Sequence, residues 1–267
     1  SHNVKDLTRT LLENGLPAEG FTFDTALAAY LIDATSGKYD LPTLFTAYFH
    51  GELPAPAHLS PDAFSLLGDA PAAEAAFHSY VSAVDALYET LAPLLKEREQ
   101  WELFETAELP LCRVLAEMEL AGCRVDKGAL ASFGEMLSRK AAALEQQIYD
   151  LAGESFNINS PKQLGEILFG KLGLPHGKKT KTGWSTNADV LEKLRYEAPI
   201  VGAVLEYRQY AKLRSTYADG LLKAMDPDGR IRTSFQMTVT DTGRLSSREP
   251  NLQNIPTRTD LGSEIRR

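Results

Sequence analysis

TGRLSSREPNLQNIPTR, residues Thr242 to Arg258, is the stretch from which the organisation of this chain can be worked out. Glycine, proline, serine and asparagine are mixed here with arginines and side-chain amides. Neither a helical nor a strand periodicity runs through the stretch, which argues against a packing role. The composition is typical of an ordered loop that recognises a polar partner, although a solvated loop without a ligand has similar ingredients.

The 267-residue chain has the composition of a globular protein, with 43% hydrophobic and 24% charged residues. This length corresponds to one large or two ordinary domains. No apolar run reaches the roughly 18 residues of a membrane span, and no signal peptide is recognisable, so we expect no membrane partner. The two cysteines, Cys112 and Cys123, favour a reducing cytoplasm and are expected to be small buried apolar residues.

The charge is distributed unevenly, although the net charge is -8. Residues 1–156 contain 10 Lys and Arg against 24 Asp and Glu, whereas residues 157–267 contain 18 against 12. This asymmetry indicates an anion-binding C-terminal part joined to an acidic N-terminal part. An accidental distribution of surface charge is the alternative.

Apolar periodicity predicts helices over 76–98, in the block that ends at Gly122, over 128–151 and over 199–224. In the block that ends at Gly122, one face is expected to carry Leu111, Val114, Leu115 and Met118. The 128–151 helix has a single apolar stripe formed by Leu130, Phe133, Leu137, Ala141, Leu144, Ile148 and Leu151. We expect this stripe to pack antiparallel against the 199–224 helix, with coiled-coil pairing as the alternative.

The segment between these two long helices contains a strongly specified helix start. Ser160 and Gln163 have the spacing of a capping box, and Pro161 would occupy the first helical position. The free N–H groups of such a helix end favour phosphate, although a capped helix without a ligand fits equally well. A lysine run, Lys178, Lys179 and Lys181, then precedes a helix start expected at Ser185 or Thr186.

The 199–224 helix carries cations, of which Arg208 and Lys212 are four residues apart and are expected to share a face. The DPDG sequence at 226–229 predicts a turn. Residues 231–240 alternate and predict one half-buried strand. On one side of this strand are Ile231, Phe235, Met237 and Val239.

The Thr242–Arg258 stretch resembles, almost letter for letter, the signature that precedes the first catalytic motif of family A DNA polymerases, the bacterial DNA polymerase I group. The resemblance extends over nearly the whole chain. It implies the C-terminal part of a ribonuclease H-like 3'–5' exonuclease domain at 1–97 and the N-terminal part of the polymerase domain at 98–267. The thumb would span about 125–225 and the start of the palm 226–267. The expected fold is mainly α with a smaller β part (α+β).

The same resemblance implies which residues contact a primer–template duplex. Arg244 would meet the primer-terminal pair, with Asn251, Gln253 and Asn254 contacting primer and template nearby. Ser247 and Arg258 would be phosphate contacts or scaffold residues. The thumb residues implied to contact the DNA are Asn159, Ser160, Lys162, Gln163, Lys179, Lys181, Arg208, Lys212 and Thr216.

The first hundred residues resemble an exonuclease that has lost metal ligands. In the family an Asn is followed four residues later by a metal-binding Asp, and a Tyr is followed four residues later by another. Here Asn3 and Tyr80 match, but Leu7 and Val84 stand at the metal-binding positions. An apolar side chain cannot coordinate a metal ion, so we predict a degenerate exonuclease site. A one-residue shift that recruits Asp6 or Asp85 is the counter-hypothesis.

Three functions remain open at this point. The first is the middle part of a bacterial, cytoplasmic and monomeric DNA polymerase that uses magnesium and deoxynucleoside triphosphates. The resemblance implies that the two carboxylates for magnesium lie beyond Arg267, so the isolated fragment is expected to be inactive. The second is a non-catalytic DNA-binding module, and the third is a 3'–5' exonuclease, which Leu7 and Val84 disfavour.

Overall fold

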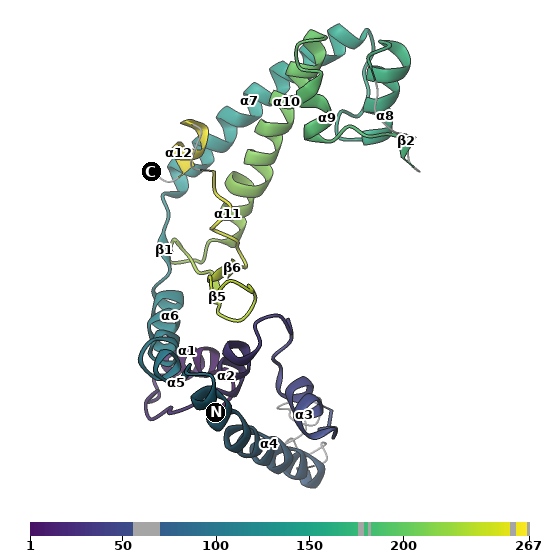
Figure 1. The fold of residues 1–267 in the computed structure, drawn as a ribbon. Helices are drawn as coiled ribbons and strands as arrows, with labels where there is room; N and C mark the ends of the chain where they lie inside the picture. Colours follow the sequence, from purple (N-terminus) through teal and green to yellow (C-terminus); the bar gives the residue numbers. More distant parts are fainter. Residues whose placement is uncertain (56–69, 176–178, 181–182, 257–259, 266–267) are drawn as a thin grey trace. The chain divides into compact units, whose positions relative to one another are not determined.

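A computed structural model describes residues 1–55, 70–175, 179–180, 183–256 and 260–265. The chain forms two compact units, and neither is continuous in sequence (Figure 1). The N-terminal unit comprises Ser1–Cys123 and Arg232–Gln253, and the long-helix unit comprises Arg124–Ile231 and Asn254–Arg267. Across the described ranges, no helix is both long and apolar enough to cross a membrane.

The N-terminal unit consists of packed helices and an antiparallel strand pair that comes from a later part of the sequence. Its elements are α1 (Val4–Glu13), α2 (Thr25–Ile32), α3 (Leu41–Phe49), α4 (Ala70–Glu97), α5 (Trp101–Leu103), the π-helical η3 (Phe104–Glu108), α6 (Leu109–Ala121), β5 (Ser234–Gln236) and β6 (Ser246–Arg248). The expected helix over 76–98 is confirmed by α4, which begins six residues earlier than the sequence predicted.

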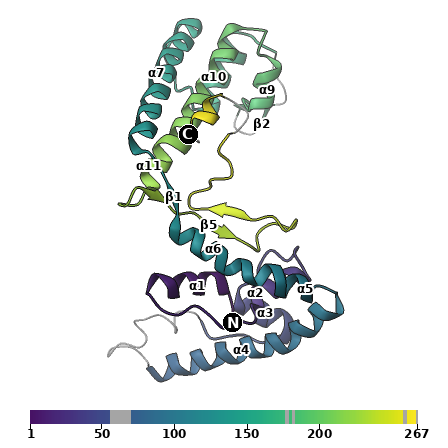
Figure 2. The same cartoon turned by 90° about the vertical axis from the view of Figure 1, so that its left-hand side faces the viewer.

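Helix α2 is the central element of this unit, because almost all of its side chains are buried. It contacts α3, α4 and η3, and α4 runs along one side of α2 and α3 (Figure 2). The buried carboxylate of Asp24 caps α2 by accepting the Ala26 N–H at 2.9 Å. It also accepts the N–H groups of Asn3 at 3.1 Å and Val4 at 2.6 Å. One carboxylate therefore holds the first turns of both α1 and α2.

The buried face of α6 differs from the predicted one. Val114 and Met118, which were expected on that face, are 51% and 50% exposed. The buried stripe instead consists of Cys112, Leu115, Ala116 and Glu119. The prediction was wrong because helical periodicity fits two neighbouring stripes of α6 equally well. The stripe that is buried contains a glutamate, which apolar periodicity does not select.

Glu119 can be buried because three groups compensate its charge and its lone pairs. Its Oε1 accepts hydrogen bonds from Lys5 Nζ at 2.7 Å and from the Phe235 N–H at 2.7 Å. Arg9 Nη1 lies 3.4 Å from Oε2. The side chain of Glu119 is fully buried and that of Lys5 is 8% exposed. This carboxylate therefore joins α6, α1 and β5.

The two cysteines have different surroundings. Cys112 is buried, as expected, and burial raises the pKa of its thiol to about 12, because the thiolate would lose its hydration. The prediction for Cys123 was wrong, since this residue is exposed. It follows Gly122, where helix α6 ends with a φ of 60° and the chain leaves the core.

The long-helix unit is dominated by an antiparallel pair, α7 against α10 and its continuation (Figures 1 and 2). Its elements are β1 (Cys123–Arg124, which begins one residue before the unit), α7 (Lys127–Ala152), α8 (Pro161–Gly165), the π-helical η4 (Glu166–Lys171), β2 (Lys179–Thr180), β3 (Gly183–Trp184), α9 (Ala188–Lys193), α10 (Pro199–Leu213), the π-helical η5 (Arg214–Asp219), α11 (Gly220–Ala224), β4 (Arg230–Ile231) and α12 (Asp260–Ile265).

The predicted long helices are confirmed, with α7 one residue longer than expected at each end. Leu130, Leu137 and Ile148 of the predicted stripe are buried, but Leu151 is 38% exposed. A Cβ on Gly134 would lie 3.2 Å from the Ala218 Cβ, which is tighter than ordinary contact. Glycine therefore allows α7 to approach η5 closely. The 199–224 helix is interrupted by η5, which periodicity alone did not reveal.

The end of this unit that carries α8, η4 and α9 has its own apolar core, which includes Leu164, Leu168, Leu191, Val201 and Val204. The helix start at Ser160 is confirmed, and its Oγ accepts the Gln163 N–H at 3.4 Å. The reciprocal half of the capping box is not made, because Gln163 Oε1 accepts the N–H of Asn157. The next helix starts at Asn187 rather than Ser185 or Thr186, with Asn187 Oδ1 accepting the Val190 N–H at 3.0 Å.

The predicted turn at 226–229 is confirmed, because the Gly229 N–H donates to the Asp226 carbonyl at 3.0 Å. The prediction of a single strand over 231–240 was wrong. The chain forms the short strand β4, leaves the extended pairing, and forms a second strand, β5; Val239, which was expected on the buried side, is 62% exposed. The break occurs at the buried Thr233, whose hydroxyl bonds to Ser247 Oγ and to the carbonyls of Arg248 and Pro250 across the hairpin. Strand β5 pairs antiparallel with β6, and Phe235 lies opposite Ser247.

Candidate nucleic-acid interface

The loop singled out in the sequence leaves strand β6 of the N-terminal unit and is organised around Ser247. This side chain is 2% exposed. Its Oγ lies 2.7 Å from Thr233 Oγ1 and 3.2 Å from the Pro250 carbonyl, and it accepts the Leu252 N–H at 3.0 Å. Of the two roles expected for Ser247, phosphate contact or scaffold, its burial supports the scaffold role.

Gln253 fastens the same loop from the other side. Its Nε2 donates to the Leu245 carbonyl at 2.8 Å, and its Oε1 accepts the Ser247 N–H at 3.2 Å. The Gln253 N–H in turn donates to Asn251 Oδ1 at 3.0 Å. The sequence suggested that these amides contact DNA, but it gave no sign that they also close the loop on itself.

Arg244 lies where the hairpin turns back into β6, and its side chain is exposed. The carbonyl of Arg244 accepts the Thr240 hydroxyl at 2.7 Å. Two residues far away in sequence also hold this hairpin. Glu119 bonds the N–H of Phe235 in β5, and the hydroxyl of Tyr30 bonds the turn that precedes Arg244. Sequence reasoning missed both, because each is polar only at the tip of a buried side chain.

The long-helix unit contains a second group of predicted contacts, on α10 and η5. Lys212 and Thr216 are exposed. Lys212 lines a pocket of about 270 Å³ with Tyr217, Asn254 and others. The hydroxyl of Tyr217 donates to the Asn254 carbonyl, which ties the last described part of the loop to η5. The exposed Asn254 side chain is therefore presented from a fixed backbone.

Arg208 and Lys212 share a helix but differ in their surroundings. The guanidinium of Arg208 is half-buried and donates through Nη1 to the Thr186 carbonyl and through Nη2 to Thr186 Oγ1 at 3.4 Å. Burial lowers the pKa of Arg208, since the charged form loses hydration. Its position makes it a brace between α10 and the segment before α9, which also explains why the buried Thr186 does not cap that helix.

The predicted contacts near the start of α8 are at the surface. Asn159, Lys162 and Gln163 are exposed, and Ser160 is half-buried. Asn159 Nδ2 lies 3.3 Å from the Tyr207 hydroxyl. Lys179 belongs to β2, which pairs antiparallel with β3. The side chain of Lys179 lies outside the described residues, as do Lys178, Lys181 and Arg258.

The positions expected to form a degenerate exonuclease site are distributed over α1 and α4. Leu7 is 37% exposed, and Val84 packs partly buried against the core. The Tyr80 hydroxyl donates to the Pro54 carbonyl at 3.0 Å, and burial raises its pKa. Asp85 is exposed on α4.

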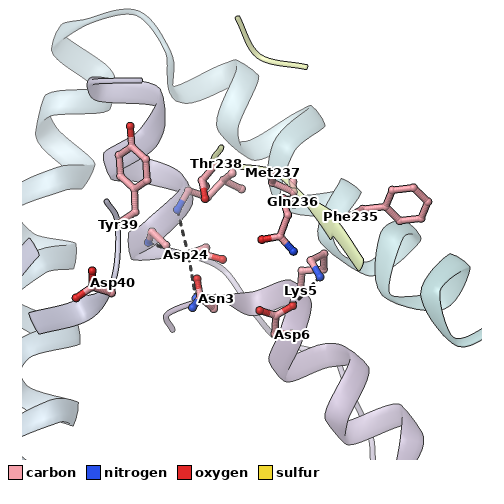
Figure 3. A pocket seen from close by; sticks show the side chains of 12 residues that line it. Asn3, Lys5, Asp6, Asp24, Tyr39, Asp40, Phe235, Gln236, Met237 and Thr238 are labelled. Carbon is pink, nitrogen blue, oxygen red and sulfur yellow. Dashed lines mark hydrogen bonds and ion pairs between the residues drawn. The ribbon is translucent and has the colours of Figure 1, made fainter. Parts of the chain in front are cut away.

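A pocket of about 210 Å³ lies beside Asn3 and Asp6 in this unit (Figure 3). Its polar lining residues are Asn3, Lys5, Asp6, Asp24, Tyr39, Asp40, Gln236 and Thr238. Asp6 accepts a hydrogen bond from Lys5 Nζ at 2.6 Å. Within the described residues, no three His, Cys, Asp or Glu side chains are grouped so that they could hold a metal ion.

Comparison with known proteins shows which protein family this chain belongs to. The model of "DNA polymerase family A" matches residues 127–267, more than half of the chain. This chain belongs to DNA polymerase family A. The match begins at the first residue of α7 and includes the loop around Ser247. The resemblance stated from the sequence is therefore confirmed, and so is the mainly helical α+β fold class.

Family A relatives also match the residues before α7. DNA polymerase I of Bacillus subtilis is 44% identical over 261 residues, which is 94% of this chain and 29% of that protein. DNA polymerase I of Streptococcus pneumoniae is 53% identical over 175 residues, or 65% of this chain and 20% of that protein. The chain thus spans less than a third of the length of the curated family A relatives it matches.

A solved family A structure has the same fold. It is described as the POL domain of Pol1 from M. smegmatis in complex with DNA primer-template and dNTP. It is 37% identical to this chain, with a TM-score of 0.84, and the match covers 99% of this chain and 44% of that one.

Proposed function

We propose that this chain is the duplex-holding part of a DNA polymerase that adds deoxynucleotides to a primer 3' end. Within it, the loop around Ser247 would meet the terminal base pair. The observation that carries the proposal is the construction of this loop. Ser247 and Thr233 direct their hydroxyl groups inward, while the side chain of Arg244 stays exposed next to a backbone that is fixed by hydrogen bonds.

A polymerase has to move along any sequence, so its contacts should be common to all base pairs. The minor groove offers such features, because purine N3 and pyrimidine O2 are acceptors at nearly equivalent places in every Watson–Crick pair. Arg244 and the amides of Asn251, Gln253 and Asn254 are donors of the right kind. A mispair displaces those acceptors, so the same contacts would favour extension of correctly paired ends.

The long-helix unit would hold the duplex through its phosphates. Lys212 and Thr216 are exposed on α10 and η5, and Asn159, Lys162 and Gln163 are exposed near the start of α8. Contacts to phosphate confer affinity and register without sequence information. This division of labour agrees with the positive balance of the C-terminal part of the chain. Arg208 is half-buried against Thr186, so it would contribute by bracing α10 more than by direct contact.

The bond-making chemistry is proposed to come from outside this chain. Polymerases of this kind use metal ions held by carboxylates to activate the attacking and leaving oxygens. The family resemblance supports placing those carboxylates, and with them magnesium and the deoxynucleoside triphosphate, in a part of the polymerase outside these 267 residues. We further propose a monomeric enzyme of the bacterial cytoplasm.

The exonuclease-like residues are proposed to be inactive as a nuclease. Leu7 and Val84 stand at the positions expected to bind a metal, and their apolar side chains cannot coordinate one. Asp6, which could replace Leu7 by a shift of one residue, is paired with Lys5. Degradation of a mismatched single-stranded 3' end by the complete enzyme, lost on Asp6→Ala or Asp85→Ala, would contradict this proposal.

The proposed role of the loop is tested by Arg244→Ala in the complete polymerase that carries this chain. We expect a loss of about 1–3 kcal/mol in transition-state stabilisation for a matched primer end, which is the range for a good contact to a base edge. The measurement is single-turnover extension from matched and mispaired ends, with the exposed Arg248, which lies 3.3 Å from Glu249, changed to Ala as the control. Unchanged extension from both ends would refute the assignment.

A further inference from the structure

Tyr30 connects the centre of the N-terminal unit to the hairpin that carries Arg244. Its side chain is 3% exposed, so it cannot itself be a surface contact. Its hydroxyl donates to the Thr240 carbonyl at 2.7 Å and accepts the Gly243 N–H at 3.1 Å. A single oxygen atom therefore joins the two ends of the four-residue segment 240–243.

That segment leads directly into Arg244. Gly243 has a φ of 75°, a left-handed conformation that glycine adopts without strain, and Arg244 is the next residue. The hydroxyl of Thr240 donates to the Arg244 carbonyl at 2.7 Å. The backbone is thus held one residue before Arg244 through Tyr30, and at the Arg244 carbonyl through Thr240.

Tyr30 extends to the turn from helix α2, which is held in place by close packing. Helix α2 is buried almost throughout, and Ala28 within it is fully buried. The ring of Tyr30 packs edge-on against that of Tyr39, with centroids 5.6 Å apart and an interplanar angle of 90°. Met237, the residue after β5, is buried in the same core. The position of the Tyr30 hydroxyl is therefore set by core packing rather than by the turn that it holds.

We infer that Tyr30 is a positioning residue for primer-end recognition, which acts by fixing the backbone from which Arg244 extends. This inference rests on the proposed function of the Arg244 loop. It gives the exonuclease-like helices a role in synthesis that does not depend on nuclease activity. The buried hydroxyl of Tyr30 on α2 would determine the direction in which Arg244 extends towards the terminal base pair.

The chain offers a matched control in Tyr39. Both tyrosines are buried in the same core, and both donate to a backbone carbonyl, since the Tyr39 hydroxyl donates to Asp33 O at 2.6 Å. The acceptor of Tyr39 is the carbonyl of Asp33, the C-cap residue of α2, which is not part of the 240–243 segment. Tyr30→Phe and Tyr39→Phe therefore remove the same group from similar surroundings, and only one of them releases the turn.

The experiment is single-turnover extension by the complete polymerase that carries this chain, from a matched and a mispaired primer end. The variants are Tyr30→Phe, Tyr39→Phe, Thr240→Val, Arg244→Ala and Tyr30→Phe combined with Arg244→Ala. An ordinary hydrogen bond corresponds to a change of about threefold to tenfold in an equilibrium constant. We expect Tyr30→Phe to lower kcat/KM for the matched end by about that factor, and Thr240→Val to act in the same direction. We expect Tyr39→Phe to stay within about twofold of the parent.

The double variant separates positioning from general support. If Tyr30 acts through Arg244, Tyr30→Phe should cost less than about twofold once Arg244 is alanine, because coupled residues are not additive. An undiminished effect in the Arg244→Ala background, equal effects of Tyr30→Phe and Tyr39→Phe, or unchanged extension in both Tyr30→Phe and Thr240→Val would overturn the inference while leaving the proposed function intact. If Arg244→Ala alone leaves extension unchanged, the proposed function itself fails, and the inference fails with it.

Discussion

The two regions proposed to contact DNA are built in different ways. The hairpin and loop of the N-terminal unit are fixed by polar side chains, because Glu119, Tyr30 and Ser247 each satisfy backbone groups of this segment. The end of the long-helix unit around α8 and α9 is built on an apolar core, to which the hydrogen bonds between Arg208 and the buried Thr186 add one polar brace, and the residues proposed to contact phosphate near the start of α8 lie at or near the surface. A hydrogen bond fixes direction as well as distance, whereas apolar packing fixes mainly proximity.

This difference matches the two tasks that we propose. Recognition of a base edge requires a donor held in a defined direction, since hydrogen bonds weaken steeply when they are misaligned. Attraction of phosphates requires only positive charge and N–H groups near the backbone, because the interaction is electrostatic and independent of sequence. The contrast can be tested by weakening each kind of support separately.

The largest effect is expected for Glu119→Ala. The change removes the buried one of the two carboxylates that Lys5 bonds, leaving only the exposed Asp6, and it removes the acceptor of the Phe235 N–H. Removing one partner of a buried ion pair costs about 3–5 kcal/mol of the free energy of unfolding. Urea titration of the variant measures this loss. Because β5 is also released, discrimination against a mispaired primer end should fall in the complete polymerase.

Glu117→Ala is the matched control for this change. Glu117 lies on the same helix, 54% exposed, with Arg113 Nε at 2.9 Å from its carboxylate. An exposed pair of this kind contributes at most about 1 kcal/mol. Equal losses in the two variants would mean that the buried carboxylate has no special role in holding the hairpin.

A smaller loss is expected for Leu168→Ala in the long-helix unit. Leu168 is fully buried in the core around α8 and α9. Truncating such a leucine costs about 2–5 kcal/mol, depending on how far the cavity collapses. The contrast predicts that affinity for primer–template falls in this variant while discrimination against a mispair does not, because the hairpin is untouched. Leu172→Ala, at a site 37% exposed, is the control. Reduced discrimination in Leu168→Ala would break the proposed division.

The sequence predicted the apolar framework better than the polar one. The long helices and the loop were found because periodicity and a resemblance to family A are visible along the chain. Glu119 was missed because its burial depends on Lys5 and Arg9, which are more than a hundred residues away. The break at Thr233 was missed for a similar reason, since its partner Ser247 comes from the other strand of the hairpin.

The choice between neighbouring helix caps was also beyond the sequence. Ser185, Thr186 and Asn187 can all cap a helix, and only the burial of Thr186 against Arg208 excludes it from this role. Among the proposed contacts, the sequence predicted residue types that suit DNA. It did not separate those that face solvent from those, such as Ser247, that hold the others in place.

The smallest effect is expected for Lys212→Ala, and it tests the other side of the contrast. Lys212 is exposed on α10, so its loss should not change the stability of the fold. If it contacts a phosphate, primer–template affinity should fall equally for matched and mispaired ends, and the slope of log K against log salt should become shallower by about 1. Titrations at several salt concentrations measure that slope. Lys38→Ala, which removes a cation that is also exposed but belongs to the N-terminal unit, should leave this slope unchanged. A preferential effect of Lys212→Ala on one kind of primer end would mean that the long-helix unit also inspects base pairing, and the separation between directional and electrostatic contacts would then be wrong.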